Sequence, residues 1–316
     1  MPNRIQAKKH FSQNFLVDTK AQERVAAGMK QICDLEDFPI IEIGPGQGDV
    51  TKRAIKWNKK LIAIEIDPEA VEYLHNNIKQ DNFELVQADA IGLLEDLESS
   101  SLPTDFTLIS SLPYHIGSRI LVDLAVACPH INFGVIHQKE VVVKTQSNPN
   151  LAQKLTFFGG WLNLFWDCKY CFDLPPHCFN PKPKVHSAFL QGFSINSQKL
   201  DWLNSKAKRV KAKSVLKLIF ANPKKTLVNN IKNLNWSQSQ ILEFIKVHCS
   251  NDVNTRLNWG NYQYILKSII ETDLDSLNLP TIRTLCQAPL LCDTKFSSSS
   301  RVKLVFGCGG FVGCVV

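Results

Sequence analysis

A short apolar run ends in a glycine-rich loop over Pro39-Ile40-Ile41-Glu42-Ile43-Gly44-Pro45-Gly46-Gln47-Gly48. The apolar run is typical of a buried β-strand, and the glycines allow a tight turn and a close approach of the backbone to a ligand. The spacing G-x-G-x-G differs from the dinucleotide-binding pattern G-x-G-x-x-G. Taken alone, the loop indicates either a ligand-binding turn or only a tight turn.

Strand-like and helix-like segments alternate after this loop. Asp67 suits the N-cap of a helix, and Pro68 suits its first position. The alternation predicts an α/β fold with a doubly wound, mostly parallel sheet, which binds ligands at the carboxyl ends of its strands. The further strands are expected at 61–66, 83–87, 106–110 and 131–137, with helices at 51–57, 68–79 and 118–127.

The composition excludes several classes of protein. The chain has 316 residues, of which 44% are hydrophobic and 21% charged, and a formal net charge of +7. It can bury a sizeable core, and its 10 cysteines are too sparse for a disulfide scaffold. The polar start lacks a signal-peptide core, and no run reaches the roughly 18 apolar residues of a membrane span. We therefore expect a soluble, cytoplasmic protein with reduced thiols and no membrane partner.

A basic segment follows the alternating region. Between Lys199 and Lys232 the chain carries ten basic residues and one acid, Asp201, and the interleaved apolar residues predict helices. This excess of positive charge is typical of a surface that binds nucleic acid, although a solvated helix surface is the alternative. The candidates for contact with RNA phosphates are Lys208, Arg209, Lys211, Lys213, Lys224 and Lys225.

These changes in composition and hydrophobic pattern divide the chain into three expected parts. The first part, 1–195, is a ligand-binding α/β domain. The second, 196–275, is a smaller basic helical domain. The third, 276–316, is a tail of unknown role that includes a serine run.

Acidic residues follow two of the predicted strands. Glu65 lies 21 residues after Gly44, where an acid in nucleotide-binding folds accepts hydrogen bonds from the ribose hydroxyls. Asp89, after the next strand, can accept a hydrogen bond from an adenine amine. Each acid alone could instead cap a helix. Because the glycine loop, Glu65 and Asp89 end successive strands, together they favour a nucleoside site.

The segment Ser111-Leu112-Pro113-Tyr114 follows the fourth strand. An exocyclic amine such as adenine N6 is a poor nucleophile, because its lone pair is delocalised into the ring. A side-chain oxygen and a proline-stiffened carbonyl can accept its two N–H bonds and help to localise that lone pair. Tyr114 offers a face for base stacking, worth roughly 1–3 kcal/mol. The alternative is a β-turn with a core tyrosine.

Several segments carry a resemblance to the motifs of one known family, in the same order. They are Lys8 to Asp18, Glu42 to Gly48, Ala63 to Asp67, Ala88 to Ala90, Leu112 to Tyr114, Gln138 to Val141 and Pro175 to Ala188. The family that these segments resemble is that of the KsgA-type rRNA adenine N6-dimethyltransferases, with the Erm resistance methyltransferases as close relatives. Two later segments, 221–231 and 254–257, favour the KsgA type.

The resemblance implies a class I methyltransferase fold with S-adenosyl-L-methionine as methyl donor. By the resemblance, 1–195 binds this cofactor and 196–275 binds rRNA. Tyr114 and Phe179 would flank the target base, and Ser111, Leu112 and Pro113 would hold its amine. The implied cofactor contacts are Asn14, Leu16, Gly44, Gly46, Glu65, Asp89 and Ser111.

The expected function is S-adenosyl-L-methionine-dependent N6,N6-dimethylation of adenosines in small-subunit (16S-type) rRNA, with a role in ribosome biogenesis. Ser111 stands where the family usually has Asn, and its shorter hydroxyl must rotate to serve as an acceptor. Two alternatives stay open: Erm-like methylation of large-subunit rRNA, and a non-catalytic ribosome-assembly factor on the same fold. The expected partner is the pre-ribosomal small subunit, and we expect a monomer.

A second cluster of residues could be interpreted as a metal site. Cys168, Cys171, His177 and Cys178 are close in sequence, and zinc sites use such ligands. The family resemblance implies no metal, and a strand is expected over 161–172. We therefore expect buried thiols and no metal at this cluster.

Overall fold

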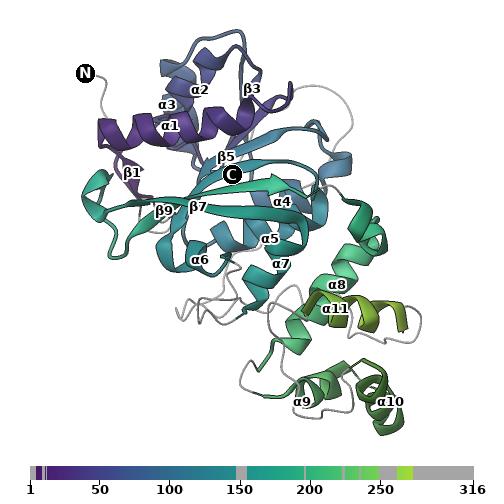
Figure 1. Ribbon diagram of the computed structural model, residues 1–316. Helices are drawn as coiled ribbons and strands as arrows, with labels where there is room; N and C mark the ends of the chain where they lie inside the picture. The colour runs from purple at the N-terminus through teal and green to yellow at the C-terminus, as the bar shows by residue number, and fades with distance from the viewer. Residues whose placement is uncertain are drawn as a thin grey trace, which may run out of the picture. The chain divides into compact units, whose positions relative to one another are not determined.

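Seven strands form the central sheet of the computed structural model (Figure 1). Their order across the sheet is β4-β3-β2-β5-β6-β9-β7. The pairs among β2 to β6 are parallel, and β9 is antiparallel to both β6 and β7. This confirms the predicted mostly parallel, doubly wound α/β sheet. The strands are β2 (Ile40–Ile43), β3 (Leu61–Glu65), β4 (Phe83–Gln87), β5 (Thr107–Ser111), β6 (Phe133–Gln138), β7 (Trp166–Leu174) and β9 (Ser187–Ser194).

The structure describes residues 5–8, 11, 13–146, 155–195, 197–222, 225–234, 236–248 and 262–272. All of them belong to one compact unit, Met1–Pro280. Lys224, the segment 254–257 and the expected tail 276–316 lie outside the described residues, so what was predicted of them stays a prediction. In the part of the chain that is described, no helix is long and apolar enough to cross a bilayer.

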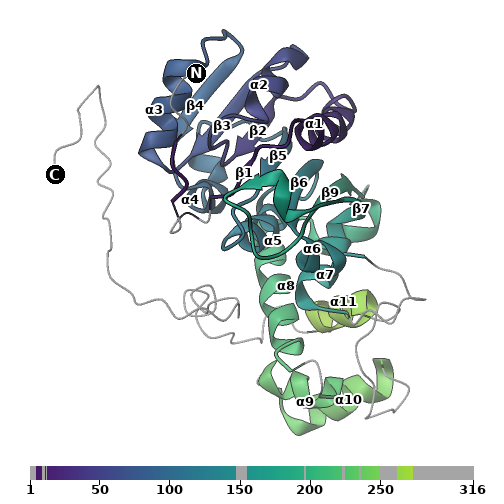
Figure 2. The same ribbon diagram turned by 90° about the vertical axis from the view of Figure 1, so that its left-hand side faces the viewer.

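Helices cover both faces of the sheet (Figures 1 and 2). One face carries α1, α2 and α3, and the other carries α4, α5 and α7. A short helix, α6, links β6 to the following segment. The bounds are α1 (Thr19–Cys33), α2 (Thr51–Ala54), α3 (Pro68–Asn77), α4 (Ala90–Glu95), α5 (Gly117–Ala127), α6 (Lys139–Val143) and α7 (Phe157–Phe165).

Two apolar clusters fill the two interfaces between sheet and helices. Successive residues of a strand point to opposite faces, so Ile40 packs with Val25 of α1, while its neighbour Ile41 belongs to the cluster under α5. The same alternation separates Leu108 from Ile109 in β5. All residues of β2 and β3 are buried, as expected for parallel strands covered on both sides.

The predicted strand over 161–172 is wrong in its first part. Residues Phe157–Phe165 form α7, and the strand β7 begins only at Trp166. The sequence of α7 is apolar almost all round, and most of the helix is buried, so its periodicity cannot distinguish a buried helix from a buried strand. Thr156 supplies the helix start, because its hydroxyl accepts a hydrogen bond from the Gly159 amide at 3.1 Å.

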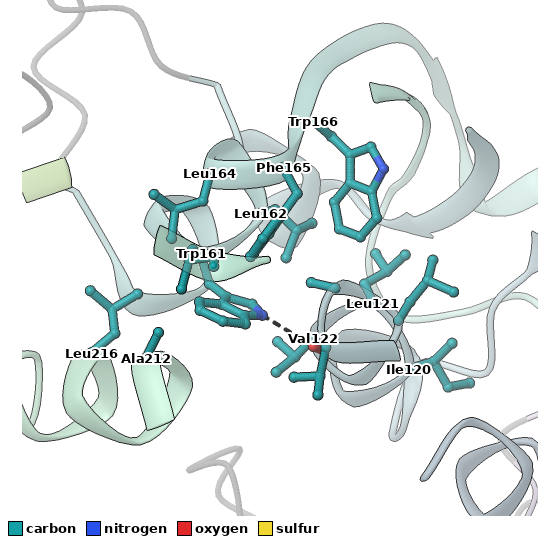
Figure 3. Close-up of a cluster of buried hydrophobic side chains, with 14 of the residues drawn as sticks. Ile120, Leu121, Val122, Trp161, Leu162, Leu164, Phe165, Trp166, Ala212 and Leu216 are labelled. Carbon is teal, nitrogen blue, oxygen red and sulfur yellow. Dashed lines mark hydrogen bonds between the residues drawn. The ribbon is translucent and has the colours of Figure 1, made fainter. Parts of the chain in front are cut away.

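The first helix of the basic segment, α8 (Lys206–Ile219), packs into the core beside α5 and α7. Figure 3 shows Trp161 between Val122 of α5 and the α8 residues Ala212 and Leu216. The Trp161 Nε1 donates a hydrogen bond to the Val122 carbonyl at 3.1 Å. The apolar stripe of α8 is therefore part of the core that supports the sheet.

Two of the predicted RNA contacts face this interface, which is a correction. Lys213 is 8% exposed, and its Nζ lies 3.0 Å from Asp123 Oδ1 of α5. Arg209 is half-buried, and its guanidinium donates hydrogen bonds to the Val126 and Leu203 carbonyls at 2.7 and 3.1 Å. Both cations bind acceptors within the protein, so neither faces outward as a phosphate contact.

Three further α-helices follow α8 in the part of the chain that is described, as the sequence predicts. They are α9 (Leu227–Ile231), α10 (Gln238–His248) and α11 (Tyr262–Thr272). Tyr262, Ile265 and Ile269 of α11 are buried in the same cluster as α7 and α8. The existence of helices here is confirmed, and the division into domains at residue 195 stays a prediction.

Candidate functional site

A cavity of about 310 Å³ opens at the carboxyl ends of β2, β3, β4 and β5. Its walls are formed by the residues that follow these strands and by the N-terminal arm, by which we mean the described residues between Ile5 and Leu16. Every cofactor contact that the sequence predicts lines this one cavity: Asn14, Leu16, Gly44, Gly46, Glu65, Asp89 and Ser111.

The glycine loop forms one wall of the cavity. Gly44 and Gly46 have φ angles of 65° and 56°, in a left-handed region that residues with a Cβ rarely enter. A Cβ at Gly46 would lie 2.8 Å from the Phe15 ring, and one at Gly44 would lie 3.6 Å from Pro113. The glycines therefore bring the loop against both the N-terminal arm and the turn that follows β5.

Glu65 ends β3 and is fixed by backbone amides. Its Oε2 accepts a hydrogen bond from the Gly46 amide at 3.1 Å, and its Oε1 accepts from the Ile66 and Asp67 amides at 2.9 and 3.0 Å. Burial raises the pKa of this carboxyl, although the three hydrogen bonds oppose the change. A carboxylate has about four lone-pair sites, so Glu65 keeps acceptor capacity for a ligand hydroxyl.

Glu42 in β2 is a site residue to which the sequence analysis gave no role. It lines the cavity and is 2% exposed, and its Oε2 has no hydrogen-bond partner among the described residues. Burial raises the pKa of this carboxyl to about 8. An acid inside an otherwise apolar strand, two residues before the first glycine of the loop, is the sequence signal that could have identified it.

The cavity lining carries acids and, among its described residues, neither lysine nor arginine. Asp49 and Asp89 line it together with Glu42 and Glu65. Asp89 also caps α4, with its Oδ1 accepting a hydrogen bond from the Ile91 amide at 3.0 Å. Ile66, another lining residue that sequence reasoning missed, is 46% exposed and offers an apolar surface. The site is suited to a cationic ligand with hydroxyl, amine and aromatic parts.

The N-terminal arm is tied to the other side of the cavity. Its strand β1 (Phe15–Leu16) pairs with β8 (Phe179–Asn180) in antiparallel register. Lys8 Nζ lies 2.6 Å from Asp67 Oδ1 and 2.9 Å from Glu69 Oε2, at the start of α3. Gln13 also donates a hydrogen bond to Asp67 at 2.9 Å. These contacts hold the arm next to Glu65.

The four residues Ser111-Leu112-Pro113-Tyr114 line the cavity next to the glycine loop. Ser111 is the last residue of β5, and the Leu112 amide donates a hydrogen bond to Ile136 of β6 at 3.1 Å. The Pro113 carbonyl accepts hydrogen bonds from the Ile116 and Gly117 amides at 3.2 and 2.8 Å. The turn is thus fixed by the sheet on one side and by the start of α5 on the other.

Phe179 does not lie where the resemblance implies, and this is a correction. Its side chain is 2% exposed, it is buried in a cluster with Leu16, Cys178 and Phe189, and it is not among the cavity-lining residues. The ring gains more from burial in this apolar cluster than it would at an open cavity mouth. In this structure only Tyr114 of the two predicted aromatics reaches the cavity.

The cysteine cluster shows no metal geometry. Among the described residues, no group of three or more His, Cys, Asp or Glu side chains could hold a metal ion. Cys168 is buried, and burial raises the pKa of its thiol to about 12. The expectation that the protein uses no metal stays a prediction.

Comparison with known sequences identifies the family. The model of the family described as "Ribosomal RNA adenine dimethylase" matches residues 4–269. The "Ribosomal RNA small subunit methyltransferase A" of Mycoplasma capricolum subsp. capricolum is 30% identical over 251 residues, which is 77% of this chain and 89% of the relative. The protein of the same name from Koribacter versatilis is 34% identical over 247 residues, 71% of this chain and 81% of the relative.

Solved structures agree on the fold. The 23S rRNA methyltransferase ErmE is similar with a TM-score of 0.56 and 20% identity, covering 80% of this chain and 98% of the ErmE chain. A dimethyladenosine transferase from Plasmodium falciparum gives a TM-score of 0.56 at 21% identity, covering 85% of this chain and 92% of the transferase chain. At these identities the two solved structures show the fold alone. The family model and the sequence relatives show that this chain belongs to the ribosomal RNA adenine dimethylase family.

Proposed function

We propose that this chain uses S-adenosylmethionine to dimethylate N6 of adenosines in small-subunit rRNA during ribosome biogenesis. The observation that carries the proposal is that one cavity gathers the glycine loop, the strand-end acids and Ser111-Leu112-Pro113-Tyr114. The names of the relatives from M. capricolum and K. versatilis support the small subunit as the target. The similarity to ErmE supports the fold alone.

S-adenosylmethionine fits the charge of the cavity. The cofactor is cationic at its sulfonium and its amino group, and it supplies an electrophilic methyl group when bound. The lining acids are complementary to that charge, and the unpartnered Oε2 of Glu42 gives a buried acceptor for a cationic N–H group. Glu65 would accept hydrogen bonds from the ribose hydroxyls and Asp89 from the adenine amine, while the exposed side chain of Ile66 would offer an apolar contact to the adenine ring.

The turn after β5 would hold the target amine. The Ser111 hydroxyl and the Leu112 carbonyl would accept the two N–H bonds of adenine N6, which favours a lone pair that points toward the cofactor. Tyr114 would stack on the base, which must first leave its own stack. Little acid–base chemistry is needed, because positioning and polarisation of the amine do most of the work.

The RNA would be held by part of the basic segment. Lys208 and Lys211 of α8 are partly exposed, and Lys225 is exposed. These lysines lie apart from the buried pair of Lys213 with Asp123 and keep a positive surface for phosphates. We propose that the enzyme works as a monomer on the pre-ribosomal small subunit, in the cytoplasm.

The test is methyl transfer from labelled S-adenosylmethionine to purified subunits from cells that lack the modification. The parent enzyme should label small subunits, and nuclease digestion should release N6,N6-dimethyladenosine. Large subunits from the same cells are the matched control substrate. Label on large subunits alone would support the Erm-like alternative. Cofactor binding without transfer to either subunit would identify a non-catalytic assembly factor.

A further inference from the structure

His137 lies behind the aromatic side chain that faces the cavity. The rings of Tyr114 and His137 are stacked, with centroids 6.3 Å apart and planes inclined by 24°. That separation is inside the range in which aromatic pairs attract one another. His137 is 1% exposed, and it belongs to β6, the strand beside Ser111.

The imidazole of His137 is held in one orientation by two hydrogen bonds. The Gln138 amide donates to Nδ1 at 2.8 Å, and Nε2 lies 3.1 Å from the Ser118 hydroxyl. Because Nδ1 accepts a hydrogen bond, the proton of the neutral ring is on Nε2, which donates to Ser118. Burial lowers the pKa of His137 to about 4, so the ring is neutral at physiological pH.

The surrounding backbone is shaped to admit this ring. Gly117 opens α5 directly under it, and a Cβ at Gly117 would lie 3.0 Å from His137 Nε2. The Tyr114 hydroxyl is fixed separately, by a hydrogen bond with the Ser187 hydroxyl. Ser187 is fully buried and pairs with Gln138, the residue after His137. Tyr114 is thus supported at its ring by β6 and at its hydroxyl by β9.

We propose that His137 is a positioning residue for methyl transfer: its ring supports one face of Tyr114, so that the other face is presented to the target adenine. This inference rests on the proposed function, in which Tyr114 stacks on the base. Without His137 the ring of Tyr114 would be held by its hydroxyl alone and could tilt, so it would have to be ordered again when the base enters, at a cost in conformational entropy.

The test separates the ring of His137 from its hydrogen bonds. His137→Phe keeps a ring behind Tyr114 and loses the acceptor for the Gln138 amide. His137→Asn keeps a polar acceptor and loses the ring. We expect His137→Asn to lower the single-turnover rate roughly tenfold at saturating subunits and cofactor, with His137→Phe within about threefold of the parent. The dissociation constant for S-adenosylmethionine should change by less than about twofold in both. Val135→Ala, a loss of buried volume on the same strand, is the control for general destabilisation.

A role that is only structural gives different results. If His137→Phe is as slow as His137→Asn, or slower while still folded, the ring is not what matters and the proposal is overturned. It is also overturned if cofactor affinity falls in parallel with the rate. Should the Phe ring prevent folding, the decision rests on His137→Asn in two backgrounds, the parent and Tyr114→Ala.

The two backgrounds also distinguish this inference from the proposed function. With Tyr114 truncated, His137→Asn should cause no further loss of rate, because nothing remains for His137 to support. A further tenfold loss would mean that His137 acts elsewhere and would overturn the inference alone. If Tyr114→Ala by itself keeps the parent's rate, the stacking role in the proposed function fails.

Discussion

Glu42→Gln should change how the stability of the cofactor-free protein depends on pH. The Glu42 carboxyl is buried without a partner for Oε2 among the described residues, and burial raises its pKa from 4.5 to about 8. In the unfolded chain the same group loses its proton near pH 4.5. Between these values the folded state binds more protons than the unfolded state, so the free energy of unfolding falls as pH rises.

The size of this effect follows from the pH interval. At about 1.4 kcal/mol per pH unit, the interval between pH 4.5 and about 8 corresponds to on the order of 5 kcal/mol. This value is an upper limit, because water that enters the cavity would shorten the interval. The contribution of Glu42 is fully present below pH 4.5 and is lost as pH rises through 8. The amide of the Glu42→Gln variant carries no titrating proton, so the variant should show no such loss.

Urea unfolding followed by tryptophan fluorescence, at pH values from 5 to 9 without cofactor, measures the difference between the two proteins. Other groups with a shifted pKa, such as Glu65 and His137, are present in both proteins and cancel to a first approximation. The parent should lose stability relative to Glu42→Gln across this range. A constant difference would show that Glu42 is already ionised in the empty cavity, and the reasoning from burial would be wrong. Cofactor binding should release a proton from the parent below pH 8 and none from this position in the variant.

Three further predictions concern the cofactor, the target amine and the RNA. Glu65→Ala should weaken S-adenosylmethionine binding by about 1–3 kcal/mol in calorimetry, because ribose hydroxyls lose a charged acceptor. Ser111→Ala should lower the single-turnover rate about tenfold with RNA affinity nearly intact, whereas Ser111→Asn should retain or raise the rate. Replacing Lys208, Lys211 and Lys225 by Gln should reduce the slope of log affinity against log salt by roughly 0.7–0.9 for each lysine that neutralises a phosphate, measured by filter binding.

Matched variants make these three results decisive. Glu72 is an exposed acid of α3, so Glu72→Ala should leave cofactor affinity unchanged, and an equal loss in both variants would remove Glu65 from the ribose site. A Ser111→Ala enzyme with the parent's rate would refute the polarising role of the hydroxyl. The exposed Lys56 lies outside the basic segment, so Lys56→Gln is the control for the loss of a positive charge elsewhere on the protein. An unchanged salt slope in the triple variant would exclude these lysines from the RNA surface.

The sequence predicts the sheet and the position of the site because both depend on local signals. Each parallel strand is a short apolar run, and ligands of such sheets bind where the strands end. Glu65, Asp89 and Ser111 could therefore be placed at one edge of the sheet, and all of them line the cavity. The start of α7 was missed because an element that is apolar on every side has no periodicity to read.

The expectations that were wrong or missing concern side chains whose surroundings come from distant parts of the chain. Phe179 matches a family motif, yet its pairing with Leu16 through β1 and β8 places it in the core. Glu42 looks like part of a strand, and only the cavity beside it makes its carboxyl a site residue. In both cases the role of the side chain depends on its burial. Burial is set by tertiary contacts, which the local sequence does not reveal.

The basic segment shows most clearly why charge in a sequence does not equal charge on a surface. Lys208 and Lys213 are five residues apart on α8, yet Lys208 is partly exposed and Lys213 is buried against Asp123. One α-helical turn holds about 3.6 residues, so a five-residue step turns the side chain well away from its starting face. A buried cation without a partner would cost several kcal/mol, and Asp123 removes that cost. Two of the four phosphate contacts predicted on this helix, Arg209 and Lys213, instead attach it to α5, and the charge left for RNA depends on the face of the helix that each remaining lysine occupies.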